Sequence, residues 1–91
     1  MVDFYADWCV SCKIMERDIF NQADVQNQLQ NWLIIKADVT KNSPSERLLQ
    51  EHLAVFGPPA LVFFKDGQET SRLVGEVTKT QFLAHINSLP H

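Results

Sequence analysis

The 91-residue sequence lacks the features that mark several common classes of protein, and each absence excludes one class. Its two cysteines are too few for a small fold held together by several disulfides. Eight basic residues against eleven acidic ones give a net charge of −3, whereas a nucleic-acid-binding protein normally carries a basic excess. No hydrophobic run approaches the ~20 residues of a membrane-spanning helix. Asp3 and Asp7 interrupt the N-terminal apolar stretch, so no signal or transit peptide is expected.

The remaining composition is that of an ordinary globular protein, with 45% hydrophobic and 10% aromatic residues. A chain of this length accommodates one hydrophobic core, so a single domain over residues 1–91 is expected. The sequence contains no internal repeat, low-complexity tract or linker. It begins inside a segment, residues 1–6, that already has the pattern of a strand.

Hydrophobic periodicity and capping motifs predict the element order β-α-α-β-α-β-β-α. Strands are expected at residues 1–6, 33–39, 60–64 and 69–74. Helices are expected at residues 9–20, after a cap at Asn21, after a cap at Ser43, and from the cap Thr78 to a stop at Pro90. The first two strands should be parallel because helices join them, and the Asp66–Gly67 turn should make the last two a hairpin. The predicted fold class is α/β, with a mixed sheet and helices on both faces.

Several large apolar side chains are expected to face the core of this fold. In the helix after Ser43, these are Leu48, Leu49 and Leu53. Trp32 and the Phe63–Phe64 pair are also expected to be core residues.

The two cysteines, Cys9 and Cys12, form a C-x-x-C motif directly after the first predicted strand. Such a motif beside a βαβ pattern is typical of thioredoxin-like redox proteins. At a helix N-terminus, unpaired N–H groups and the helix dipole should lower the pKa of Cys9 and favour its reactive thiolate. Cys12, one turn later, could then attack a mixed disulfide formed on Cys9. Trp8 would supply an apolar platform beside them.

Other interpretations of these residues remain open. The cysteines could be inert buried thiols, or half of a zinc site, to which His52 and His85 could be recruited only by an accident of folding. Zinc needs four ligands, and the sequence has no second C-x-x-C motif. Asp3 could be a solvated acid on a frayed strand. Glu16 could be an exposed helix acid paired with neighbouring charges, and Trp8 could be a simple core residue.

Two segments of the sequence resemble the thioredoxin superfamily. Residues 3–13 (Asp-Phe-Tyr-Ala-Asp-Trp-Cys-Val-Ser-Cys-Lys) are similar to its active-site strand and helix, and residues 57–60 (Gly-Pro-Pro-Ala) to its cis-proline segment. The pattern is most similar to the C-terminal periplasmic domain of the DsbD family of thiol:disulfide interchange proteins, as are residues 36–40 and 55–59. This resemblance covers essentially the whole chain. It implies a minimal thioredoxin fold of βαβ unit, β-hairpin and helix, without the N-terminal strand and helix of longer thioredoxins.

The resemblance also implies roles for individual residues. Cys9 would be the nucleophile and Cys12 the resolving thiol. Asp3 would be the buried acid of the superfamily and Glu16 a second acid near the cysteines. Pro59, in the cis position, would pair with the substrate backbone, and Pro58 and Trp8 would join it in substrate binding. Val10-Ser11 differs from the Gly-Pro of thioredoxin, and Ala60 stands where the superfamily often has threonine.

The expected function is therefore thiol–disulfide exchange, with no bound cofactor and no metal. The resemblance implies that electrons arrive from a membrane-embedded cysteine pair and leave to an N-terminal periplasmic domain, so this chain would act in the periplasm, as a monomer when isolated. Two alternatives are a redox-inert thioredoxin-like binding module and a stand-alone thioredoxin-like reductase. Because the N-terminal strand of longer thioredoxins is missing, strand 33–39 is expected to form an unpaired sheet edge prone to aggregation.

Overall fold

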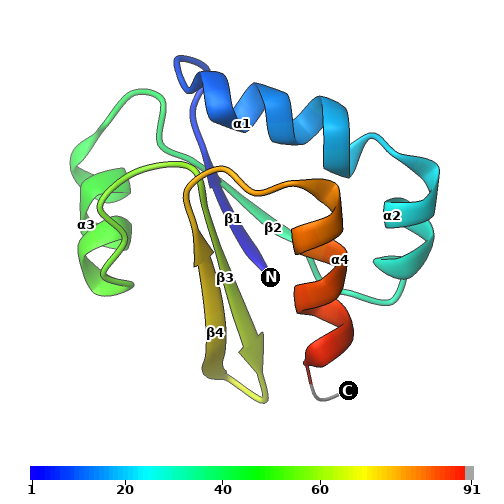
Figure 1. The fold of residues 1–91 in the computed structure, drawn as a ribbon. Helices are drawn as coiled ribbons and strands as arrows, with labels where there is room; N and C mark the ends of the chain where they lie inside the picture. The colour runs from blue at the N-terminus through cyan, green and yellow to red at the C-terminus, as the bar shows by residue number, and fades with distance from the viewer. Residues whose placement is uncertain (90–91) are drawn as a thin grey trace.

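Four strands form one mixed sheet in the order β2-β1-β3-β4 in the computed structural model, which describes residues 1–89 (Figure 1). The strands are β1 (Val2–Tyr5), β2 (Ile35–Asp38), β3 (Ala60–Lys65) and β4 (Gln68–Val74). β1 pairs with β2 in parallel and with β3 antiparallel, and β3 and β4 form the predicted hairpin. The α/β element order and the mixed sheet are confirmed. β2 lies at the edge, paired within residues 1–89 only with β1.

The helices are α1 (Val10–Met15), its π-helical continuation η1 (Glu16–Phe20), α2 (Ala23–Gln28), α3 (Pro44–His52) and α4 (Lys79–Ser88). Ser43 and Thr78 cap α3 and α4 through complete capping boxes, as predicted. The predicted cap at Asn21 is wrong, because the N–H of Asn21 closes η1 on the carbonyl of Glu16 at 2.9 Å. Gln22 therefore precedes α2 instead. The predicted stop at Pro90 lies outside the described residues.

The sheet carries a hydrophobic core on each face because side chains alternate along its strands. On β3, Leu61 and Phe63 point to one face, and Ala60 and Val62 to the other. The first face is covered by α1, η1, α2 and α4, and the second by the α3 side of the molecule (Figure 1). Asp3 pairs with Leu61 across β1 and β3, which places its carboxyl on the first face, beneath α1.

Two of the expected core residues are in fact exposed. Leu48 is 67% and Leu49 40% exposed, and α3 buries none of its residues. The contacts with the core come instead from the segment just after α3, where Leu53 is partly buried and Val55 is buried. Trp32 is partly buried against Phe63, with ring centroids 5.9 Å apart, which confirms its place at the core.

Among residues 1–89, no helix has the length and hydrophobicity needed to cross a bilayer.

Candidate redox site at the start of α1

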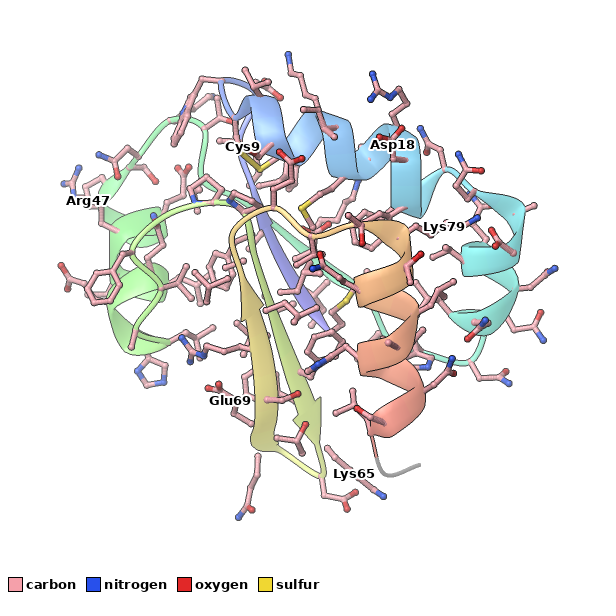
Figure 2. All side chains as sticks on the ribbon, in the orientation of Figure 1. Cys9, Asp18, Arg47, Lys65, Glu69 and Lys79 are labelled. Atoms are coloured by element: carbon pink, nitrogen blue, oxygen red, sulfur yellow. A yellow bond between two sulfur atoms is a disulfide. The ribbon has the colours of Figure 1, made fainter. Side chains whose placement is uncertain are left out.

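Cys9 occupies the position predicted for it, at the N-terminus of α1. After β1, the chain turns through a hydrogen bond from the Cys9 N–H to the Ala6 carbonyl (3.1 Å). The Cys9 backbone is extended, as an N-cap requires, and its Sγ accepts a hydrogen bond from the Cys12 N–H at 3.1 Å. Cys9 and Cys12 form a disulfide (Figure 2). Cys9 is buried and Cys12 partly exposed, so the disulfide reaches the surface on the Cys12 side.

The loop before Cys9 is tied to the end of β2 by Thr40. The Thr40 hydroxyl accepts the N–H of Asp7 at 2.9 Å, and the Thr40 carbonyl accepts the indole N–H of Trp8 at 3.1 Å. Thr40 in turn donates to the Asp38 carboxylate, which holds the pKa of Asp38 below its usual value. Trp8 is 61% exposed, so the alternative that it is a simple core residue is wrong. Thr40 was not predicted as a site residue because it stands in an ordinary polar loop, with no pattern that marks it.

Replacing Thr40 with valine removes the hydroxyl that accepts the Asp7 N–H and donates to Asp38. We expect the free energy of unfolding to fall by about 1 kcal/mol, the usual worth of such hydrogen bonds. Thr40→Ser keeps the hydroxyl and should retain most of the stability. Urea unfolding of the three proteins measures the difference; equal midpoints for the valine variant and the wild type would show that Thr40 does not hold this loop.

A cavity of about 180 Å³ lies under α1 beside the cysteines. Its lining brings together four of the predicted site residues: Asp3, Cys12, Glu16 and Pro59. Cys9, Trp8 and Pro58 lie outside the lining. Asp3 is the only buried residue with a polar or charged side chain among residues 1–89, with 7% of its surface exposed. The alternative of a solvated acid on a frayed strand is therefore wrong.

Burial raises the pKa of Asp3 to about 6. Lys36 opposes this shift and Glu16 adds to it. The ammonium of Lys36 lies 3.5 Å from the Glu16 carboxylate and 5.2 Å from the centre of the Tyr5 ring. Glu16 is thus both a surface acid in an ion pair, as one interpretation expected, and part of the cavity wall. Lys36 and Asp38 interrupt the apolar residues 33–39 as Asp3 interrupts residues 1–6, so the sequence pattern that marks Asp3 also marks Lys36, together with Asp38.

The peptide bond between Pro58 and Pro59 is cis, the geometry expected from the resemblance. Both prolines are partly buried, and the Pro59 carbonyl accepts the N–H of Gly75, just after β4, at 3.0 Å. Pro59 faces the same cavity as Cys12. The cis-proline segment and the C-x-x-C motif, far apart in sequence, therefore meet at one site.

The zinc interpretation finds no support in the arrangement of side chains. Across residues 1–89, no group of three or more His, Cys, Asp or Glu side chains is placed to hold a metal ion. His85 lies on α4, with its Nε2 2.9 Å from the Ser71 hydroxyl, and His52 is exposed at the end of α3.

Comparison with known proteins gives sequence matches along the whole chain. A thioredoxin-like domain family matches residues 1–90. The thiol:disulfide interchange protein DsbD of Klebsiella pneumoniae is 45% identical over 89 residues, which cover 94% of this chain and 15% of that protein. DsbD of Photorhabdus laumondii is 44% identical over 93 residues, covering 99% of this chain and 16% of that protein. The chain thus spans 15–16% of the length of these curated relatives.

Solved structures agree with these sequence matches. The C-terminal domain of Neisseria meningitidis DsbD in the oxidised form superposes with a TM-score of 0.85 at 34% identity, covering 94% of this chain and 75% of that one. A thioredoxin from Thermus thermophilus gives a TM-score of 0.80 at 25% identity, covering 94% of this chain and 68% of that one. Both similarities confirm the predicted thioredoxin fold.

Proposed function

Because this chain belongs to the thioredoxin-like domain family, we propose that it is a thiol–disulfide oxidoreductase working through Cys9 and Cys12. The observation that carries the proposal is the disulfide between these two cysteines at the start of α1, beside a cis-proline and a buried acid. The similarity to proteins named as thiol:disulfide interchange proteins supports the same chemistry.

The reaction begins with the reduced protein. The Cys9 thiolate attacks one sulfur of a partner disulfide, forming a Cys9–partner disulfide and releasing the other partner sulfur as a thiolate. The Cys12 thiolate then attacks the Cys9 sulfur. This step restores the Cys9–Cys12 disulfide and releases the second partner thiolate. Two electrons pass to the partner, and its two thiolates take up the two protons that the cysteines gave up.

The neighbouring residues supply proton transfer and docking in this proposal. Asp3 accepts the proton of Cys12, because the two line one cavity and a pKa of about 6 suits a base near neutral pH. Glu16, which lines the same cavity, adds to the rise in the pKa of Asp3. Pro58, Pro59 and the exposed Trp8 form the contact surface for the partner's backbone, a patch suited to transient docking.

We further propose that this chain acts as a C-terminal DsbD-type domain in the periplasm. Its electrons would come from a membrane-embedded cysteine pair and pass to an N-terminal periplasmic domain. The support for this placement is the similarity to DsbD proteins several times longer than the chain, and to a solved DsbD C-terminal domain.

A redox titration tests the chemistry directly. The protein is equilibrated with glutathione couples of graded ratio, quenched by alkylation of free thiols, and scored for the Cys9–Cys12 disulfide. We expect one reversible two-electron transition between about −270 and −120 mV, the range of thioredoxin-like proteins. A disulfide that does not titrate in this range would favour the redox-inert binding module.

A rate comparison separates a DsbD-type domain from a stand-alone reductase. The reduced protein is mixed with the oxidised N-terminal domain of Klebsiella pneumoniae DsbD and, separately, with insulin. Faster reduction of the DsbD domain supports the proposed partner. Equal or slower reduction would favour a general thioredoxin-like reductase.

A further inference from the structure

Arg72 on β4 joins that strand to the end of α3. Its guanidinium donates to the carbonyls of Leu53 (2.8 Å) and Ala54 (3.0 Å). It also makes a two-pronged ion pair with Glu69, with distances of 2.7 and 2.6 Å. The side chains of Arg72 and Glu69 are 28% and 34% exposed, less than those of any other ion pair within residues 1–89. Bidentate geometry and partial shielding are the conditions under which an ion pair contributes to structure.

A β-bulge brings Glu69 and Arg72 to the same face of the sheet. Residues three apart on a regular strand point to opposite faces. On β3, Phe63 pairs with Ser71 of β4, but the next residue, Phe64, pairs with Glu69. Thr70 is therefore an extra residue without a partner on β3, which is the definition of a β-bulge. Glu69 consequently shares a face with Arg72, the face on which α3 lies. Figure 2 shows Glu69 on β4. The pair is therefore set by the fold of the hairpin.

The two carbonyls that Arg72 holds begin the connection from α3 to the cis-proline. Ala54 adopts a left-handed conformation with φ of +54°, which is unfavourable for a residue with a side chain. Within the connection, Phe56 is fully exposed, and no atom lies within 4 Å of a Cβ built on Gly57. Core packing therefore holds this segment near its start, through the partly buried Leu53 and the buried Val55. At the start of the connection, the N–H groups of Ala54 and Val55 bond back to α3, and Arg72 is the side chain that ties the Leu53 and Ala54 carbonyls to β4. At its end, the Gly75 N–H holds the Pro59 carbonyl.

We propose that Arg72 is a positioning residue that fixes the Pro58–Pro59 segment for docking of protein disulfides. This inference rests on the proposed function and adds a determinant of substrate preference to it. A partner protein must align its backbone along Pro59, and a loosened segment would have to be ordered at each encounter. A small disulfide needs only access to the sulfur. Loss of the Arg72 contacts therefore slows exchange with proteins selectively.

The test compares Arg72→Met with the matched control Arg47→Met. Arg47 also donates to a backbone carbonyl, that of Asn42 at 2.6 Å, but at the opposite end of α3 (Figure 2). For Arg72→Met, we expect kcat/KM for insulin reduction to fall about tenfold, mainly through KM, and the rate with dithiodipyridine to change less than about twofold. The midpoint potential should match the wild type. Arg47→Met should leave both rates unchanged.

Two further measurements keep the outcome decisive. Arg72→Lys keeps the charge but cannot reproduce the planar fork, so insulin reduction should recover only in part; this variant carries the test if the methionine variant does not fold. Hydrogen exchange at the Val55 and Gly75 amides, which donate to the carbonyls of Gln50 (2.8 Å) and Pro59 (3.0 Å), should be faster in both variants. Unchanged insulin kinetics, or equal losses with both disulfides, would overturn the positioning role. A wild-type protein inert toward both disulfides would overturn the proposed function as well.

Discussion

Replacing Cys9 with serine is expected to reduce disulfide exchange by at least ~1,000-fold, because the variant has no sulfur at the position of the attacking group. Cys9 is the N-cap of α1, and its Sγ accepts the Cys12 N–H, an arrangement that stabilises negative charge on this sulfur. The variant still has the Cys12 thiol, but this thiol does not lie at the N-cap of α1. The measurement is the rate of insulin reduction by the pre-reduced protein, compared with the wild type.

The matched variant Cys12→Ser separates attack from release. Cys9 can still form a disulfide with the partner, but no second thiol is present to resolve it. A stable mixed disulfide should therefore accumulate, visible as a higher-mass species that a reductant cleaves. Full activity of Cys9→Ser would contradict the assignment of the nucleophile. Trapping by Cys9→Ser in place of Cys12→Ser would show that the two roles are reversed.

Much of the fold could be predicted from interactions between residues that are close in sequence. The capping boxes at Ser43 and Thr78 use contacts within four residues, so they can be found in the sequence alone. The Asp66–Gly67 turn is equally local, with positive φ at both residues. The redox site was predictable for a different reason: a C-x-x-C spacing after a strand, and an acid in an apolar strand, are both unusual enough to carry meaning.

The misses depend on geometry that no short pattern encodes. The π-helical segment η1 ends at Asn21, so the cap of α2 is Gln22, one residue later than predicted. The leucines of α3 match a helical periodicity, yet the helix meets the sheet only through the segment after it. The Arg72–Glu69 pair requires a bulge that creates a contact between residues whose spacing in a strand argues against one.

The acid at position 3 should make the stability of the oxidised protein depend on pH. Its pKa is raised to about 6 in the folded state by burial and lies near 3.8 as an unperturbed carboxyl. Between these values, the folded protein binds more protons than the unfolded chain, so the free energy of unfolding falls as pH rises. Below about pH 4 both states are protonated and Asp3 contributes no penalty. Above about pH 6 the full penalty, roughly 3 kcal/mol at most, is present.

Asp3→Asn removes this titration while keeping a side chain of the same shape. Relative to wild type, the variant should gain roughly 2–3 kcal/mol of stability between pH 4 and pH 7, on top of any pH-independent offset. Urea unfolding of both oxidised proteins at a series of pH values measures the difference, and the oxidised form is used because its cysteines do not titrate.

Asp24→Asn provides a control of opposite sign. A hydrogen bond from Lys79, 2.8 Å away, lowers the pKa of Asp24, so its stabilising effect is present at neutral pH and lost as pH falls. The Asp24 variant should therefore lose stability at neutral pH where the Asp3 variant gains it. A flat difference curve for Asp3→Asn would contradict a raised pKa. A stability difference that grows between pH 4 and pH 7 would show that the fold tolerates a destabilising acid in the cavity that Cys12 also lines. Such a cost in stability is expected when a buried acid is kept for proton transfer.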